Sequence, residues 1–162
     1  MNLVLIARKE ELLNKIADEI RTQYEVQVEV IIADFGMGGN IYKKIEDGLV
    51  GKDIGILVNN VGVAQDLKYF HHETEENIWN MINVNIGAMT LMTKMILPTM
   101  EVKKKGAIIN VASAASYSPQ PFLSMYSATK AYMDFLSRGT FYIHNMVIFH
   151  PTCLFRPTRL IL

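Results

Sequence analysis

Cysteine is nearly absent from this sequence, which has one, Cys153, in 162 residues. A lone thiol cannot close a disulfide within the chain, which excludes the small disulfide-stapled classes and suits a reducing compartment. An excess of charge of either sign is missing too, since Lys plus Arg and Asp plus Glu both number 16. Because the chain has no net positive charge, its charge does not favour binding to nucleic acid or to an anionic membrane surface. We therefore expect no nucleic-acid partner.

Long uninterrupted apolar runs are also lacking. The run Leu3–Ala7 gives way at once to charged residues and is shorter than the apolar region of a signal peptide. The longest apolar stretch, residues 86–100, is interrupted by Lys94 and Pro98 and falls short of the roughly 20 residues that a spanning helix needs. We therefore expect no export signal and no membrane span in this chain.

Apolar residues nevertheless make up 50% of the sequence, enough for one compact core. No repeat, linker or low-complexity tract divides it, so a single domain over residues 1–162 is predicted. Apolar runs typical of buried strands alternate with segments of helical periodicity. Strands are expected at residues 3–7, 26–32, 54–58, 107–111 and 146–149, and helices at 12–24, 41–49, 75–100 and 125–138. This alternation predicts an α/β doubly wound parallel sheet.

Polar residues follow the expected strands at their carboxyl ends, the edge at which such sheets bind ligands. Arg8, Asp34, Asn59, Asn60 and Ser113 hold these positions. They are the first candidates for a functional site.

Tyr126 and Lys130 are four residues apart on an expected helix, so their side chains project from one face. Such a pair is usually solvated when it stands alone. Here the pair comes shortly after Ser113, which ends a buried strand. The loop between Ser113 and Tyr126 is rich in small residues and proline, and it could fold Ser113 back over the helix.

Four segments carry a family resemblance: ILVNNVG, INVNIGAM, GAIINVASAAS and YSATKAY. In order and spacing they resemble the motifs of short-chain dehydrogenases/reductases, which have a Rossmann-like fold. With LIARKEELL, the chain looks most similar to the branch of 17β-hydroxysteroid dehydrogenases, very-long-chain 3-oxoacyl-CoA reductases and hydroxysteroid dehydrogenase-like proteins.

The resemblance implies a catalytic set of Ser113, Tyr126, Lys130 and Asn85. A ketone that accepts hydride develops negative charge on its oxygen, and a phenol within hydrogen-bond reach can supply the proton. Lys130 would favour the tyrosinate and bind the nicotinamide ribose, and Ser113 would hold the substrate oxygen. Asn85 would hold a water that links the lysine to solvent; from the residues alone, it reads as a helix residue that bonds its own backbone.

The same resemblance implies cofactor binding by Arg8, Asp34, Asn59, Asn60 and Gly62, together with Tyr126 and Lys130. Arg8 follows the first strand, where a guanidinium would pair with a 2′-phosphate and no acidic residue stands to bind a free 2′-hydroxyl, which favours NADP(H) over NAD(H). The other reading of Arg8 is a solvated residue in the first turn of a helix.

Two departures from the family pattern are visible. The glycine-rich TGxxxGxG turn is not in the sequence, so the first βα unit, whose strand lies in the family between those matching residues 3–7 and 54–58, is expected to be missing. After residue 138 the chain passes quickly to its last expected strand; Arg156 replaces an expected threonine and Thr158 lies two residues late. We therefore predict a truncated fold that also lacks the substrate-binding region.

Two functions remain open. One is an NADP(H)-dependent oxidoreductase that reduces a ketone of a lipid or steroid substrate, either a steroid or a 3-oxoacyl-CoA. The other is a catalytically inactive dehydrogenase-like interaction protein or fragment. The resemblance implies a location at the endoplasmic reticulum, and the cytoplasm and mitochondria remain alternatives. Whether the chain forms a homodimer is also left open.

A metal site is not expected. Residues of metal-ligand type gather only at His71, His72, Glu73, Glu75 and Glu76, and consecutive residues do not point at one centre. A polar loop and helix start is the better interpretation.

Overall fold

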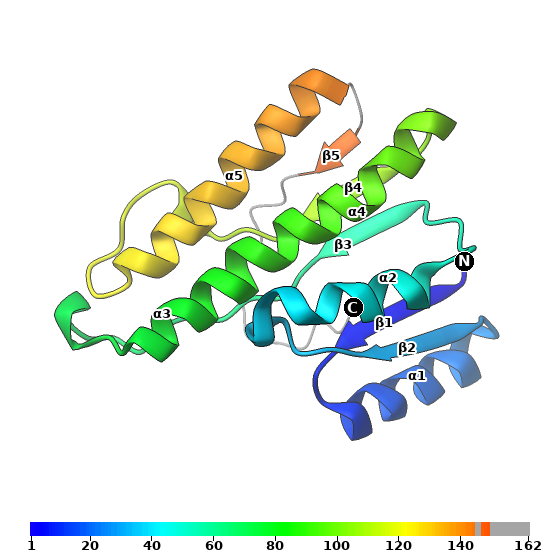
Figure 1. Ribbon diagram of the computed structural model, residues 1–162, viewed down its shortest axis with the longest axis horizontal. Coiled ribbons are helices and arrows are strands. Elements are labelled where there is room, and N and C mark those ends of the chain that lie inside the picture. Colours follow the sequence, from blue (N-terminus) through cyan, green and yellow to red (C-terminus); the bar gives the residue numbers. More distant parts are fainter. Residues whose placement is uncertain (145–146, 150–162) are drawn as a thin grey trace.

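The structure is a computed structural model that describes residues 1–144 and 147–149, and side chains for residues 1–140. Strands and helices alternate along the chain (Figure 1). The strands are β1 Leu3–Ala7, β2 Val28–Ile32, β3 Ile56–Asn59, β4 Ala107–Asn110 and β5 Val147–Phe149. The α-helices are α1 Glu10–Tyr24, α2 Tyr42–Leu49, α3 Glu75–Met81, α4 Ala88–Lys103 and α5 Ser124–His144. Short 3₁₀ segments are η1 Phe35–Ile41, η2 Phe70–His72 and η4 Ala114–Ser116, and a π-helical segment, η3, spans Ile82–Gly87.

All strand pairs in the described residues are parallel, which confirms the predicted α/β fold. The strands form two separate sheets, one in the order β1-β2 and one in the order β3-β4-β5. In the described part of the chain no ladder joins β1 to β3, the two strands between which a central strand was expected to be missing.

The helices cover both faces of the β1-β2 sheet because its apolar side chains alternate between the two faces. Leu5 and Val28 pack with Leu13 and Ile16 of α1. On the opposite face Ile31 packs in a cluster with residues of α2 and α4. A third cluster joins Ile96 and Met100 of α4 to Ile108 of β4.

Two segments differ from the prediction. The helix expected over residues 125–138 continues to His144, so the expected rapid end after residue 138 is wrong. Gly139 costs about 1 kcal/mol in a helix interior, and packing of α5 against β5 and η3 outweighs it. The glycine-rich sequence GMGG at residues 36–39, which lies between the expected strand and the expected helix, is part of η1. Asp34 accepts a hydrogen bond from the Gly36 amide there, and only Gly38 (φ 70°) leaves helical geometry.

The long helix predicted for residues 75–100 is one continuous helical rod with a change of winding in its middle. Thr74 caps its start by accepting a hydrogen bond from the Asn77 amide. The winding widens to π-helix over Ile82–Gly87 before α4 continues. Such π segments often occur at functional sites, and this one carries Asn85.

Among the residues described, no helix combines the length and the apolar character required to cross a bilayer.

Candidate active site

The predicted site residues gather at the carboxyl-end edge of the parallel sheets. Arg8 directly follows β1, Asp34 lies just beyond β2, and Asn59 ends β3. Ser113 follows β4 and caps η4, its Oγ accepting a hydrogen bond from the Ala115 amide at 3.3 Å. Because α5 packs against η4, Ser113 is held next to the helix that carries Tyr126 and Lys130.

Lys130 is a buried cation with its side chain turned toward the end of β4. It is only 5% exposed, and its Nζ donates to the Val111 carbonyl oxygen at 3.1 Å. The same Nζ lies 5.6 Å from the centroid of the Tyr126 ring, so the two side chains meet as their spacing predicted. Burial lowers the pKa of Lys130 from 10.5 to about 8, because desolvation disfavours the charged form.

We expect Lys130 to titrate near pH 8 in the folded chain. Its folded-state pKa lies below the unfolded value, so the unfolded state binds more protons between about pH 8 and 10.5. The free energy of unfolding should therefore rise with pH across that window. The measurement is an NMR titration of lysine side-chain signals, with Lys130→Met to assign the resonance. A midpoint for Lys130 above pH 10 would contradict the prediction.

Asn85 is fully buried and forms three hydrogen bonds through its side-chain amide. Its Oδ1 accepts from the Val63 amide, and its Nδ2 donates to the Val63 carbonyl oxygen, both at 2.8 Å. Nδ2 also donates to Thr129 Oγ1 at 3.0 Å. The reading in which Asn85 bonds its own helix backbone is therefore wrong; its amide joins the loop after β3 to α5.

Gly62 brings this loop close to both catalytic candidates. A Cβ added at Gly62 would lie 3.4 Å from Lys130 Nζ and 3.6 Å from Asn85 Oδ1. The absence of a side chain at Gly62 lets the loop after β3 pass close to the lysine ammonium. Gly62 thus links the predicted cofactor residues to the predicted catalytic ones.

A second cross-link was not predicted from the sequence. Gln65 Oε1 accepts a hydrogen bond from the Tyr126 backbone amide, and Gln65 Nε2 donates to the Phe122 carbonyl oxygen, both at 3.1 Å. One side chain therefore ties the loop after β3 to the start of α5. A glutamine in a polar loop gives no periodic signal, so no sequence pattern marks this role.

The ends of β3 and β4 are joined by a buried network of side-chain hydrogen bonds. Asn59 Nδ2 donates to Thr93 Oγ1 at 3.1 Å and to Asn110 Oδ1 at 2.7 Å, and Asn110 Nδ2 donates to Ser137 Oγ at 2.8 Å. Asn59 was predicted to bind the cofactor, and its side-chain amide belongs to this network between β3, β4, α4 and α5. Asn110 was not singled out, although an asparagine at the end of the run AIIN marks a polar group that must be satisfied inside the core.

Arg8 and Asp34 lie next to each other at the outer part of the edge. Their side chains are 57% and 38% exposed, with 3.9 Å between Arg8 Nη1 and Asp34 Oδ2. The sequence shows no acid directly after β1, yet the fold brings this carboxylate beside Arg8 from the next strand. An exposed pair at this distance is weak, so the guanidinium is available to another anion.

A shallow hollow of about 590 Å³ adjoins this pair. Arg8, Lys9 and Lys44 line it together with Asp34, so three cations face one carboxylate. Lys44 is oriented there by donating to the Ile32 carbonyl oxygen at 2.7 Å. The hollow is therefore suited to a small, doubly charged anion.

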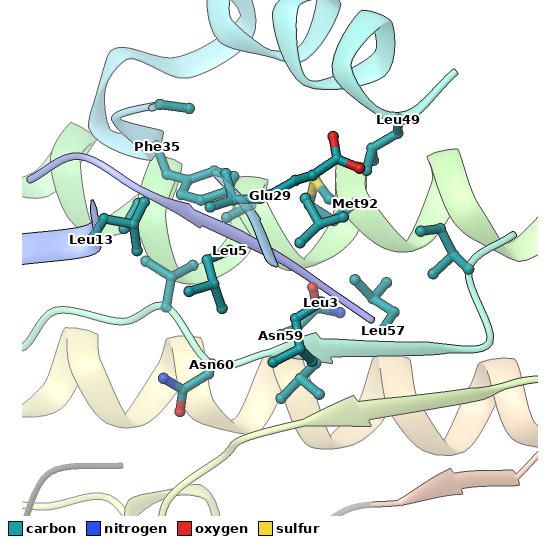
Figure 2. A pocket seen from close by; sticks show the side chains of 18 of the residues that line it. Leu3, Leu5, Leu13, Glu29, Phe35, Leu49, Leu57, Asn59, Asn60 and Met92 are labelled. Carbon is teal, nitrogen blue, oxygen red and sulfur yellow. The ribbon is translucent and has the colours of Figure 1, made fainter. Parts of the chain in front are cut away.

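A cavity of about 1010 Å³ lies between β1 and β3. Figure 2 shows Leu3 and Leu5 on one side of it and Leu57, Asn59 and Asn60 on the other. Its lining includes all the residues predicted to bind cofactor apart from Tyr126 and Lys130: Arg8, Asp34, Asn59, Asn60 and Gly62. The catalytic candidates do not line it, but two of them, Lys130 and Asn85, lie close to Gly62 in its wall.

The histidine and glutamate cluster has the structure expected of a loop and helix start. His71 and His72 belong to η2, and Glu75 and Glu76 form the first turn of α3. Over residues 1–144 and 147–149 no group of three or more His, Cys, Asp or Glu side chains is arranged to hold a metal ion. Cys153, Arg156 and Thr158 lie outside the described residues.

A family model described as short chain dehydrogenase matches residues 1–141. Over 143 residues the chain is 45% identical to the human protein named inactive hydroxysteroid dehydrogenase-like protein 1, covering 88% of this chain and 43% of the relative. Over 142 residues it is 45% identical to the very-long-chain 3-oxoacyl-CoA reductase of Anas platyrhynchos, covering 86% of this chain and 46% of that protein. The chain thus spans a little under half the length of these curated relatives.

A solved structure of a short-chain dehydrogenase has a similar fold. The short-chain dehydrogenase from Sphingobium yanoikuyae in complex with NADPH superposes with a TM-score of 0.82 at 34% sequence identity. The match covers 89% of this chain and 56% of that one. The arrangement of strands and helices around the candidate site is therefore one already seen with a bound nicotinamide cofactor.

Proposed function

Because this chain belongs to the short chain dehydrogenase family, we propose that it contributes the catalytic set of an NADP(H)-dependent oxidoreductase. The reaction is reduction of a ketone in a steroid or a 3-oxoacyl-CoA. The observation that carries the proposal is the position of the buried Lys130 side chain, whose Nζ lies 5.6 Å from the centroid of the Tyr126 ring. Both residues are on α5, which packs against η4, the segment capped by Ser113. We further propose that residues 1–162 form a single partial domain.

The side chains would divide the reaction between them. A bound nicotinamide supplies the hydride for the carbonyl carbon. Tyr126 Oη would give its proton to the carbonyl oxygen as negative charge develops there. Ser113 Oγ would hold that oxygen, and the Lys130 ammonium would stabilise the tyrosinate that remains. With a pKa near 8, Lys130 is also able to pass a proton on at neutral pH.

The preference for NADP(H) rests on the cationic hollow at the end of β1. A 2′-phosphate brings about two negative charges, which Arg8, Lys9 and Lys44 can meet, whereas a free 2′-hydroxyl gains little from them. Asp34 is close enough to orient Arg8 and reduces, without cancelling, the positive charge of the hollow.

We expect Arg8→Asp to reduce or reverse a preference for NADPH over NADH. The test uses a version of the chain preceded by a strand and a TGxxxGxG turn, with affinities for both cofactors measured by titration calorimetry. Loss of one charge-assisted pair should weaken NADPH binding by roughly tenfold to a hundredfold. Lys15→Asp, the same kind of charge change on the exposed surface of α1, is the matched control. Equal affinities for the two cofactors before mutation would overturn the preference.

The inactive interaction protein is the second candidate. It is favoured by one observation: the chain is as similar to a relative named inactive, at 45% identity, as to a named reductase, also at 45%. Retention of Tyr126, Lys130 and Ser113 supports the enzyme. For the whole protein, the names of these relatives support a lipid or steroid substrate. A place at the endoplasmic reticulum is proposed from the family resemblance of the sequence.

A further inference from the structure

We infer that Gln65 is a positioning residue for the proposed reaction: its side-chain amide holds the backbone of Tyr126, so that the phenol stays beside Lys130. This role rests on the proposed function, since Tyr126 is the proton donor there. It adds to the catalytic set a side chain from the loop after β3. The observations that support it are the capping of α5, the backbone just before α5, and the hydrogen bonds that anchor the loop.

Tyr126 lies in the first turn of α5, and the ends of helices are the parts that fray. The Ser127 amide donates to the Leu123 carbonyl oxygen at 2.9 Å, so Leu123 holds the N-cap position and Tyr126 is the third helical residue. An N-cap side chain with an oxygen accepts a hydrogen bond from the amide of the second or third helical residue. A leucine side chain cannot do so. The Tyr126 amide, which has no partner within the helix, therefore needs an acceptor from elsewhere.

Gln65 supplies this acceptor from 61 residues earlier in the chain, because its Oε1 accepts from the Tyr126 amide at 3.1 Å. The corresponding bond of α3 is local. Thr74 is the N-cap residue there and accepts from the amide of Asn77, the third helical residue, at 3.2 Å. The two helices thus have the same type of cap hydrogen bond, but that of α5 comes from another segment. The first turn of α5 is therefore tied to the position of the loop after β3.

The same side chain also holds the backbone just before α5. Gln65 Nε2 donates to the Phe122 carbonyl oxygen at 3.1 Å. Phe122 has a φ of 62°, in the left-handed region that bulky residues avoid. Such a conformation persists only where the surrounding structure fixes it. Gln65 thus fixes the entry into α5 as well as its first turn.

The loop that carries Gln65 is anchored by Asn85. The Asn85 side chain accepts from the Val63 amide and donates to the Val63 carbonyl oxygen, both at 2.8 Å. Asn85 Nδ2 also donates to Thr129 Oγ1 at 3.0 Å, and Thr129 Oγ1 donates to the Tyr126 carbonyl oxygen at 2.8 Å. The amide of Tyr126 is therefore linked to Asn85 through the loop and Gln65, and its carbonyl through Thr129. Both ends of the Tyr126 backbone are held.

This hold matters for proton transfer because the phenol must lie within hydrogen-bond reach of the carbonyl oxygen. Lys130, one turn further along α5, is held separately, since its Nζ donates to the Val111 carbonyl oxygen. Without the amide of Gln65 the first turn of α5 would fray while Lys130 stays in place. The phenol would then lose its alignment with the ammonium and with the ketone. The effect should appear in kcat rather than in KM, because the contacts that bind ketone and cofactor are kept.

Gln65→Met tests this role, because methionine has a similar length and lacks the amide. In the version of the chain that carries a preceding strand and TGxxxGxG turn, kcat for ketone reduction should fall by roughly tenfold to a hundredfold, the cost of about 1 Å of misplacement. The KM values for ketone and NADPH should stay close to those of the parent. Gln65→Glu keeps the acceptor, and a carboxylate is favoured near a helix N-terminus, so this variant should recover most of the lost kcat.

Thr74→Val is the matched control, because it removes the same type of cap hydrogen bond from α3. It should lower thermal stability about as much as Gln65→Met and leave kcat at the parent value. Four results would overturn the inference. They are an unchanged kcat in Gln65→Met, a loss that appears in KM alone, equal kcat values for the methionine and glutamate variants, and an equal loss in Thr74→Val.

NMR spectroscopy of the 162-residue chain tests the same role without catalysis. The Lys130 side-chain signals, assigned with Lys130→Met, should carry a ring-current shift from Tyr126 that disappears in Gln65→Met and remains in Gln65→Glu. The Tyr126 amide should exchange with solvent at least about tenfold faster in Gln65→Met. Unchanged Lys130 signals and unchanged exchange would show that Gln65 does not position Tyr126. A parent that reduced no ketone would instead count against the proposed function, and these two measurements would still decide what Gln65 does.

Discussion

Tyr126→Phe should lower carbonyl reduction by roughly 10²–10⁴-fold, the usual contribution of a positioned general acid. The experiment uses the version of the chain that carries a preceding strand and TGxxxGxG turn, and it follows NADPH consumption with a steroid ketone and a 3-oxoacyl-CoA. The substitution removes the proton donor and keeps the ring beside Lys130. Folding should therefore change little, as monitored by thermal unfolding.

Tyr132→Phe is the matched control for this loss. Tyr132 lies on the same helix, is 37% exposed, and its hydroxyl hydrogen-bonds with Thr90 Oγ1 at 3.0 Å. Losing that phenol should cost activity little. A Tyr126→Phe protein that reduced ketones near the parent rate would remove Tyr126 from its role. A parent that reduced neither substrate would favour the interaction protein.

The 162-residue chain by itself should bind NADPH at least about 100-fold more weakly than the version with the glycine-rich turn. A dinucleotide pyrophosphate is normally held by backbone N–H groups of such a turn at a helix N-terminus. Losing two charge-assisted hydrogen bonds costs about 3 kcal/mol, which is close to a hundredfold in affinity. The cationic hollow around Arg8 and Lys44 contacts only the other end of the cofactor in this proposal.

Titration calorimetry of both proteins with NADPH checks this expectation. Arg8→Asp in the short chain provides the control, because any residual affinity should come from the hollow and decrease in that variant. Comparable tight binding by the two proteins would show that the remaining residues are sufficient without the turn.

The order of elements could be predicted from the sequence because buried parallel strands and amphipathic helices have distinct periods. The runs at residues 3–7 and 107–111 were located to within one residue at each end. The continuation of α5 to His144 was not, since Gly139 and Thr140 signal a helix end when only local propensity is considered. Contacts of α5 with β5 and η3 override that propensity, and they join residues far apart in the chain.

In the candidate site, too, some residues could be identified from the sequence and others could not. Ser113, Tyr126 and Lys130 could be identified because their spacing and neighbouring segments form a specific pattern. Gln65 and Asn110 could not, because their roles depend on hydrogen bonds across 61 and 27 residues of sequence, respectively. Asn85 was identified, but its hydrogen bonds to the Val63 backbone were not predicted. They are made from a π-helical segment, which the periodicity of an α-helix does not predict.

The cluster beneath α1 bears on the order in which parts of the molecule fold. Its buried members, Leu5, Leu13, Ile16, Ala17 and Val28, all come from one short stretch of sequence, residues 5–28. The ladder between β3 and β4, in contrast, pairs residues as far apart in the sequence as Ile56 and Ala107. Contacts between residues near in sequence form faster than distant pairings, because less chain entropy is lost when they close. We therefore expect β1, α1 and β2 to assemble before the β3-β4-β5 sheet.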